Sequence, residues 1–312
     1  MQELCAGLDL ELVLLETQRR GGLRYLILGG RTVGLLLRRR VRVLLVQNPS
    51  LILASLVVLL RPLLGYHLIV DAHNEAIEPY INRQAWIRAL SRWVIRKANL
   101  TIVSNRQLAQ LVDGWGGRSF TLPDPIPRPP PAAAARPLGG AFNVVLIATH
   151  ARDEPIAQIF EAVRGSDLRL YVTGNPRRMA PALAAAAPPN VTFTGFLPDA
   201  EYWALLRSAD GIIDLTLMGD CLVSGAYEAL AVGTPMLLSN NQASVELFGG
   251  AATFTDNTTA DIRRALQALR GGSNDLRVAA ELKRDELVER WRAKARDLIS
   301  VIHKYAIPQP RT

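Results

Sequence analysis

The residues best suited to chemistry lie in segment 214–235, which reads DLTLMGDCLVSGAYEALAVGTP. An apolar strand is expected to end near Leu217, and Ser224 and Gly225 are expected to open a helix. The first backbone N–H groups of a helix have no partner inside it, and they face an anion with the positive end of the helix dipole. Glu228 lies one turn further on, where its carboxylate can accept hydrogen bonds from a vicinal diol such as a ribose. The segment therefore predicts a site for a nucleotide diphosphate.

Two acids in this segment, Asp220 and Glu228, are eight positions apart and form an Asp-x7-Glu pattern. The pattern resembles the Glu-x7-Glu pair of the GT-B nucleotide-sugar glycosyltransferases, most closely their family 4. The resemblance implies that Glu228 binds the donor ribose, that Asp220 contacts hydroxyls of the transferred sugar, and that the helix start holds the diphosphate. Aspartate reaches one methylene less far than glutamate. The alternative is a Rossmann-like strand and helix with incidental surface acids.

The composition indicates a globular protein without a structural metal or disulfide framework. A chain of 312 residues, with 21% charged and 49% hydrophobic residues, is long enough for two domains. Its two cysteines, Cys5 and Cys221, and its four scattered histidines give no metal-ligand spacing. The opening MQELCAGLDL has no basic end followed by an apolar run, so no signal peptide is expected. These features predict a cytoplasmic protein.

The net charge of +8 is unevenly distributed. Residues 1–125 hold 16 Lys/Arg and 9 Asp/Glu, or +7, whereas residues 126–312 hold 20 and 19, or +1. This asymmetry points to an anionic partner of the first half: a membrane surface, a phosphorylated acceptor or nucleic acid. Solubility charge in an arginine-rich chain is the alternative. The cluster Arg38–Arg40 is expected to complement a helix C-terminus, with anionic lipid as the other interpretation.

Proline marks the boundary between two expected domains. Segment 122–140 contains seven prolines and no apolar periodicity, as a stiff linker does. We expect an N-terminal domain at 1–125, a linker at 126–140 and a C-terminal domain at 141–312. The resemblance implies the α/β GT-B fold, with two Rossmann-like domains facing each other across a cleft and a terminal helix (282–305) crossing back to the first domain.

The first half predicts alternating strands and helices. Strands are expected at 8–15, 43–46, 67–70 and 100–103, and helices at 23–37, 51–64 and 87–98. In family 4, segment 8–15 would be the second strand, so the first strand of the domain would be missing. That strand is central in a doubly wound sheet, and its loss leaves ladder partners unpaired. We expect a reading frame that begins upstream of Met1, with an incomplete lobe as the alternative.

His73 follows the strand at 67–70, in the sequence Asp71-Ala-His73-Asn74. Ligands of open α/β sheets bind at the carboxyl ends of strands, so His73 is expected to contact the donor or to handle a proton. A histidine that closes a loop by hydrogen bonding is the alternative. The QNP and DxHN motifs here resemble the lipid-linked chitobiose β-mannosyltransferases, which are GT-B enzymes.

Three further strand ends supply the remaining candidate residues for donor binding. The strand at 142–148 leads to Arg152, although family 4 usually offers both an arginine and a lysine there. The next strands are expected at 168–173 and 191–195. The site residues implied after them are Gly174, Asn175, Arg177, Phe196 and Leu197, the last two meeting the base. Arg177 either neutralises phosphate or caps the following helix.

The resemblance implies a glycosyltransferase that uses a UDP- or GDP-sugar, with no cofactor and no metal. The implied acceptor is lipid-linked or a polysaccharide in cell-envelope or exopolysaccharide synthesis. The enzyme is expected in the cytoplasm, either free or associated with the inner face of the plasma membrane. Retention and inversion at the anomeric carbon both stay open. An inactive nucleotide-sugar-binding scaffold is the alternative. A dinucleotide-dependent oxidoreductase lacks its GxGxxG motif, and nucleic-acid binding has only charge in its favour.

Overall fold

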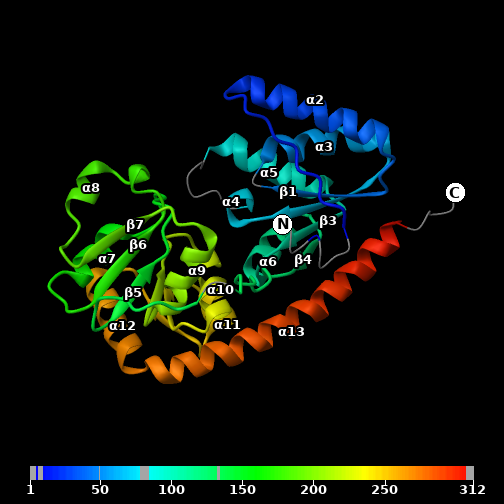
Figure 1. Ribbon diagram of the computed structural model, residues 1–312. Helices are drawn as coiled ribbons and strands as arrows, with labels where there is room; N and C mark the ends of the chain where they lie inside the picture. Colours follow the sequence, from blue (N-terminus) through cyan, green and yellow to red (C-terminus); the bar gives the residue numbers. More distant parts are fainter. Residues whose placement is uncertain (1–4, 6–9, 49, 78–83, 132–133, 307–312) are drawn as a thin grey trace. The chain divides into compact units, whose positions relative to one another are not determined.

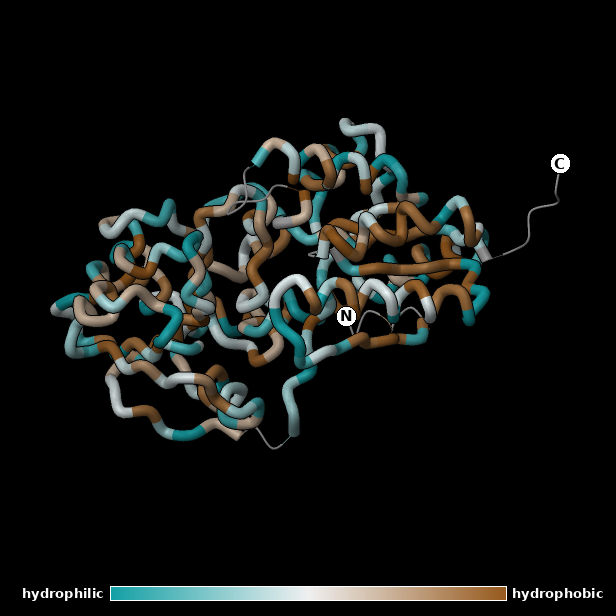
Figure 2. The backbone as a smooth tube through the Cα atoms, turned by 90° about the horizontal axis from the view of Figure 1, so that it is seen from above, coloured by the Kyte–Doolittle hydropathy of each residue, from teal (hydrophilic) through white to brown (hydrophobic). Residues whose placement is uncertain are grey.

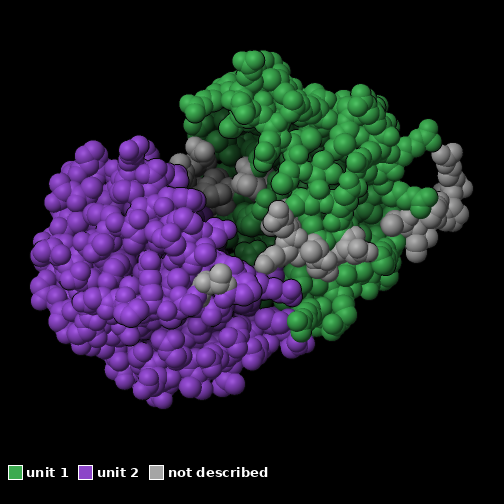
Figure 3. Space-filling model, in the orientation of Figure 1, with its two compact units in different colours: residues 1–124, 290–312 green, residues 125–289 purple. Residues whose placement is uncertain are grey.

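The chain divides into two compact units, which are coloured separately in Figure 3. A computed structural model describes residues 5, 10–48, 50–77, 84–131 and 134–306. Unit 1 comprises Met1–Asp124 and Arg290–Thr312, and unit 2 comprises Pro125–Glu289. The proline-rich segment therefore begins where the chain passes from one unit to the other, and most of it is counted with unit 2.

Unit 1 is built on a parallel four-stranded sheet with helices between consecutive strands (Figure 1). The strands lie in the order β1-β2-β3-β4 and all pair in parallel. They are β1 (Val43–Asn48), β2 (His67–Ala72), β3 (Leu100–Val103) and β4 (Ser119–Thr121). The helices are α2 (Gly22–Arg38), α3 (Leu51–Leu64), α4 (Asn74–Ile77), α5 (Ala85–Lys97) and α6 (Arg106–Gly114). Strands with helices on them are buried on both faces, which explains why β3 is buried throughout.

The strand predicted at 8–15 is wrong over the part that the structure describes. Residues 10–15 form neither strand nor helix, and residues 8 and 9 lie outside the described part. Leu14 is 63% exposed, and Val13 is exposed as well. Leu10 packs against the cluster that contains Ile69 and Ile102, but residues 10–15 pair with no strand. An apolar run alone does not distinguish a strand from an extended segment that lies on the core.

Unit 2 is a parallel six-stranded sheet in the order β10-β9-β8-β5-β6-β7. Its strands are β5 (Asn143–Leu146), β6 (Arg169–Thr173), β7 (Val191–Gly195), β8 (Gly211–Asp214), β9 (Met236–Ser239) and β10 (Ala252–Thr255). The chain enters at β5, moves outward through β6 and β7, and then returns to β8 on the other side of β5. The sheet therefore has its topological switch point between β5 and β8, where ligands of doubly wound folds bind.

Helices cover both faces of this sheet (Figure 1). They are α7 (Ile156–Val163), the 3-10 turn η1 (Pro176–Arg178), α8 (Pro181–Ala185), α9 (Asp199–Ser208), α10 (Ser224–Val232), α11 (Gln242–Phe248), α12 (Thr259–Gly271) and α13 (Ser273–Ala306). Figure 2 shows hydrophobic and hydrophilic stretches that alternate along the chain. Val144, Leu146 and Ile213 are buried in one core cluster with α7 and α12, while Val145 and Ile212 face another with α9 and α10. Because successive side chains of β5 point to opposite faces of the sheet, this strand contributes to both hydrophobic cores.

Helix α13 begins in unit 2 and ends in unit 1. Its last turns pack Ala295, Leu298 and Ile302 into the cluster that contains Ile69 of β2 and Ile102 of β3. The ring of Tyr305 stacks on His67 with centroids 4.8 Å apart. Burial of these apolar side chains explains why a helix with many charged residues ends on unit 1.

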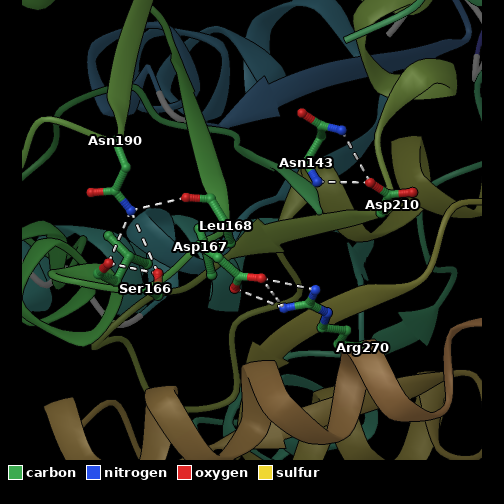
Figure 4. Close-up of polar contacts among 8 residues, drawn as sticks. Asn143, Ser166, Asp167, Leu168, Asn190, Asp210 and Arg270 are labelled. Atoms are coloured by element: carbon green, nitrogen blue, oxygen red, sulfur yellow. Dashed lines mark hydrogen bonds and ion pairs between the residues drawn. The ribbon is translucent and has the colours of Figure 1, made fainter. Parts of the chain in front are cut away.

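The amino ends of the unit 2 strands are fixed by polar contacts (Figure 4). Asp210 accepts hydrogen bonds from the backbone and the side-chain nitrogen of Asn143, at 2.7 and 3.3 Å. Arg270 binds both carboxylate oxygens of Asp167. Asn190 donates to the carbonyl of Leu168 at 2.9 Å. These bonds tie the start of β5 to β8, and the segment before β6 to α12 and β7.

Candidate nucleotide site

The loops after β5 and β8 meet at the switch point of the unit 2 sheet. The Thr216 hydroxyl donates to the Asp153 carboxylate at 2.7 Å, and the Leu217 N–H donates to the Asp153 carbonyl at 2.7 Å. Because both bonds join the same pair of loops, the two strand ends are held together as one surface. Arg152, the predicted phosphate-binding arginine, lies on the first of these loops with its side chain exposed.

The carboxylate of Glu154 fixes the conformation of the loop after β5 through hydrogen bonds inside that loop. Glu154 accepts hydrogen bonds from the backbone N–H and the hydroxyl of Thr149, at 2.9 and 2.6 Å, and from the N–H of His150 at 2.9 Å. His150 has φ of 59°, a left-handed conformation that is uncommon for a residue with a side chain. Burial lowers the pKa of His150. The loop is therefore held in a specific shape by Glu154, which the sequence analysis did not single out.

The end of β6 approaches this loop so closely that only glycine fits. Gly174 has φ of 86°, and a Cβ atom there would lie 2.1 Å from the carbonyl oxygen of Ala148. Asn175 accepts a hydrogen bond from the N–H of Arg177 at 3.1 Å and so caps η1. The side chain of Arg177 is exposed. The predicted residues Gly174, Asn175 and Arg177 therefore follow β6 at the same edge of the sheet as Arg152.

The start of α10 is partly occupied by a neighbouring acid. The N–H of Gly225 donates to Asp214 Oδ2 at 2.8 Å, and a Cβ atom at Gly225 would lie 2.4 Å from that oxygen. The prediction of free amides at this helix start is therefore wrong at Gly225, because β8 ends in an aspartate that reaches it. Burial raises the pKa of Asp214 well above its usual value, and the nearby carboxylates of Glu154 and Glu228 raise it further. Ser224 is exposed.

Glu228 is held by a tyrosine from the neighbouring helix. The hydroxyl of Tyr202, on α9, donates to Oε2 of Glu228. Among the described residues no hydrogen bond is formed by Oε1. Burial raises the pKa of Glu228, while the bond from Tyr202 acts in the opposite direction. The hydrogen bond from Tyr202 therefore orients the Glu228 carboxylate through Oε2, and Oε1 is available to accept another hydrogen bond.

The remaining predicted residues of unit 2 lie after β7 and β8. Phe196 is 86% exposed directly after Gly195, and Leu197 packs against the core cluster of α9 and α10. Asp220 is half-buried in the β8 loop with φ of 50°. The structure thus places all ten predicted residues of unit 2 after the carboxyl ends of β5, β6, β7 and β8. An aromatic side chain as exposed as Phe196 is suited to stacking on a base.

His73 belongs to unit 1, at the carboxyl end of β2. Its Nε2 lies 2.8 Å from the side-chain nitrogen of Gln47 and 3.7 Å from Asp71 Oδ2. The nearby carboxylate of Asp71 raises the pKa of His73, partly against burial, and the charge of Asp124 adds to the increase. Burial in turn raises the pKa of Asp124. His73 therefore lies in an acidic group that favours its protonated form.

Sequence reasoning missed the partners that orient these residues, namely Tyr202, Asp214 and Glu154. Tyr202 and Asp214 act on residues of α10, so spacing along the chain gives no signal for their contacts. Glu154 bonds to Thr149 and His150 within its own loop, five and four residues away. Within the part of the chain that the structure describes, no group of three or more His, Cys, Asp or Glu residues is arranged to hold a metal ion.

No protein-family model matches the sequence, and no curated protein matches it either. Solved structures do resemble it. Sucrose-phosphate synthase from Thermosynechococcus elongatus superposes with a TM-score of 0.71 at 16% identity, over 88% of this chain and 76% of that one. HepE from Anabaena, in complex with UDP and glucose, gives 0.74 at 13% identity over 97% and 88%. The α,α-trehalose 6-phosphate synthase from Burkholderia multivorans gives 0.70 at 14% identity, over 94% and 79%. The chain therefore has the α/β GT-B fold with two Rossmann-like domains.

Proposed function

We propose that this chain is a glycosyltransferase that uses a nucleotide-diphosphate sugar. One observation carries the proposal: Glu228 stands one turn into the helix that follows the switch point, with one carboxylate oxygen fixed by Tyr202 and the other available to a ribose. HepE, which shares the fold, is seen in complex with UDP and with UDP-glucose. Both points support a donor site at the carboxyl edge of the unit 2 sheet.

In this proposal, the residues that follow β5, β6, β7 and β8 each bind a different part of the donor. Glu228 accepts from the ribose hydroxyls, and Asp220 contacts hydroxyls of the sugar. The diphosphate lies against the start of α10 near Ser224. The charge of the diphosphate is neutralised by Arg152 and Arg177. The backbone around it is shaped by Gly174, Asn175 and Gly225. The base lies against Phe196 and Leu197.

The transfer step needs positioning and stabilisation of the leaving group more than covalent participation. The bond between the anomeric carbon and the diphosphate oxygen breaks, an acceptor hydroxyl oxygen bonds to that carbon, and the hydroxyl proton passes to a base. Amide dipoles and the two arginines stabilise the charge that develops on the diphosphate. His73 is proposed as the group of unit 1 that contacts the donor or handles the proton.

The finer assignment rests on the sequence resemblances. These favour a family 4-like enzyme whose acceptor is lipid-linked or a polysaccharide of the cell envelope. The likeness around His73 to lipid-linked chitobiose β-mannosyltransferases supports the same class of acceptor. The proposed donor is a UDP- or GDP-sugar, and the proposed place of action is the cytoplasm at the inner face of the membrane.

A second candidate function, an inactive nucleotide-sugar-binding scaffold, is favoured by one feature of the site. The β5 loop offers Arg152 to a diphosphate but also carries Asp153 and Glu154, and Asp214 accepts the hydrogen bond of the Gly225 amide. A site with this many acids binds an anion less strongly than one with several cations. Binding without turnover would distinguish this candidate from the enzyme.

A thermal-shift panel of UDP-, GDP- and ADP-sugars tests the proposal, because a ligand that binds only the folded state raises the melting temperature. Ligands that stabilise the wild type are then assayed for sugar transfer and for donor hydrolysis. Glu228→Gln should abolish the shift, whereas Glu201→Gln, an exposed acid on α9, should keep it. The absence of a shift with every donor in the panel would contradict the proposal.

A further inference from the structure

The first helices of unit 1 are distinguished by their charge and by their exposed apolar side chains. Residues 17–70 contain nine arginines and no lysine, aspartate or glutamate. Of the fifteen large hydrophobic residues that are exposed in the described part of the chain, ten lie between Val13 and Trp86. Isolated exposed apolar residues need no explanation, but a group of them marks an interaction surface. Seven of these ten, from Leu23 to Leu63, lie within the stretch that carries only positive charge.

Helix α2 has an apolar stripe on its outer face. Leu23, Leu26 and Leu37 are exposed, with Leu26 at 74%, while Thr32 and Leu36 on the opposite side are buried. Residues 23, 26, 30 and 37 follow the spacing of a single helical face. Three arginines at intervals of seven residues form a parallel stripe beside it: Arg24, Arg31 and Arg38. The helix therefore presents leucine and arginine together to the outside.

Helix α3 continues this surface. Ile52, Leu59 and Leu63 share one exposed face, with Leu63 at 81%, and the opposite face buries Ala54, Val57 and Val58 in the core. The two helices lie side by side in Figure 1. A Cβ atom at Gly29 of α2 would lie 3.8 Å from Leu56 of α3, so they contact each other along that line. The exposed stripes of both helices lie on the solvent side of this contact.

We propose that α2 and α3 form a docking surface for an anionic lipid bilayer. Leucine and isoleucine side chains enter the boundary between headgroups and acyl chains, and the flanking guanidinium groups bind lipid phosphates. No helix in the described part of the chain is long and apolar enough to cross a membrane. The surface therefore lies on the bilayer, in the plane of its interface.

Charge and apolar exposure together favour a lipid bilayer over two other partners, a second copy of the chain and a nucleic acid. A second copy of the chain would bring one arginine-rich surface against another, which is electrostatically unfavourable. A nucleic acid would use the arginines but would leave the leucine stripes in water. An anionic bilayer satisfies both the charge and the apolar stripes. The proposal does not depend on the nucleotide site in unit 2.

Vesicle flotation of the purified chain tests the proposal. The chain should float with vesicles of phosphatidylcholine mixed with phosphatidylglycerol, float poorly with phosphatidylcholine alone, and be released by salt. Replacing three exposed arginines (Arg24, Arg38 and Arg40) with glutamine should weaken binding about 100-fold, since each basic residue near the surface contributes roughly fivefold. The double variant Leu26→Ser/Leu63→Ser should also lose binding.

Matched control variants in unit 2 distinguish binding through this surface from nonspecific binding of the chain to vesicles. They are Arg169→Gln/Arg207→Gln/Arg264→Gln and Val278→Ser/Leu282→Ser, all at exposed positions, and both should float as the wild type does. Equal binding of all variants, or no preference for anionic vesicles, would overturn the proposal. A wild-type dimer that the leucine variants convert to a monomer would assign the surface to a second copy instead. Donor-induced thermal shifts should be unchanged in every variant, which keeps this test separate from the proposed function.

Discussion

The two edges of the unit 2 sheet differ in how their polar groups are used. At the amino edge, Asn143 and Asp210 bond to each other, and Arg270 pairs with Asp167 through both carboxylate oxygens. At the carboxyl edge, Asp214 is a half-buried acid with a raised pKa. A sheet whose strands all run in one direction allows the two roles to separate. At the amino edge these side chains bond mainly to each other, although Oδ1 of Asn190 is buried without a partner among the described residues, and the carboxyl edge retains groups that a ligand can satisfy.

The carboxyl edge also holds unusual backbone and unpartnered side-chain atoms. His150 and Asp220 are two of the three residues other than glycine with positive φ in the described part of the chain. Both ring nitrogens of His150 are buried without a hydrogen-bond partner among the described residues. Strained backbone and unsatisfied polar groups are destabilising, and they concentrate where function requires them. The contrast between the edges therefore predicts different effects of mutation.

The largest effect is expected at Gly174, where the β5 loop and the end of β6 meet. Gly174→Ala would place Cβ 2.1 Å from a backbone oxygen, and it should lower the free energy of unfolding by about 4 kcal/mol or prevent folding. Gly195→Ala is the matched control: it has φ of 71° but no neighbour within 4 Å, so it should cost only about 1–2 kcal/mol. Urea denaturation measures both. Equal losses would show that the close approach is relieved by a backbone shift.

At the amino edge, Asn143→Ala should affect stability without affecting the site. The side chain bonds to the backbone of Gly140 in both directions and to Asp210, so its loss should cost about 1–3 kcal/mol of unfolding free energy. The affinity for a nucleotide diphosphate, measured by isothermal titration calorimetry, should stay the same. A drop in affinity comparable to that of Glu228→Gln would remove the distinction between the edges.

Tyr202→Phe should act on the site through Glu228. Loss of the hydroxyl removes one hydrogen bond to a carboxylate and should weaken nucleotide binding about tenfold. The same bond lowers the pKa of Glu228, so its removal should raise that pKa further. Binding that needs the ionised carboxylate should then rise with pH at a higher midpoint than in the wild type. An unchanged midpoint in calorimetric titrations over a series of pH values would exclude a positioning role for Tyr202.

The smallest effect on stability and binding is expected for a substitution of Asp214. The direction of that effect tests whether the acid opposes diphosphate binding. The pKa of this acid is raised in the folded chain, so its contribution to stability is fully present at low pH and is lost as the pH rises through the folded pKa. Asp214→Asn keeps an oxygen for the Gly225 N–H and removes the charge. It should flatten the dependence of unfolding free energy on pH and strengthen diphosphate binding at neutral pH. A steeper dependence, or weaker binding, would contradict this account of the acid.

Much of the unit 2 framework could be predicted, because its strands are short apolar runs that end in polar loops. The strand at 191–195 was predicted with its observed bounds, as was the helix at 51–64 in unit 1. Segment 8–15 failed because hydrophobicity alone does not supply a ladder partner. The contacts of Glu228 with Tyr202 and of Gly225 with Asp214 could not be predicted, since each depends on how neighbouring elements pack.

The central claim is that a nucleotide-diphosphate sugar binds at the carboxyl edge of the unit 2 sheet. Hydrogen–deuterium exchange with and without the best donor of the thermal-shift panel tests it most directly. The account predicts new protection in segments 149–155, 174–178, 196–198 and 215–228, and little change at the amino edge around Asn143, Asp167 and Asn190. Protection that is absent from residues 215–228, or that centres on the amino edge, would contradict it.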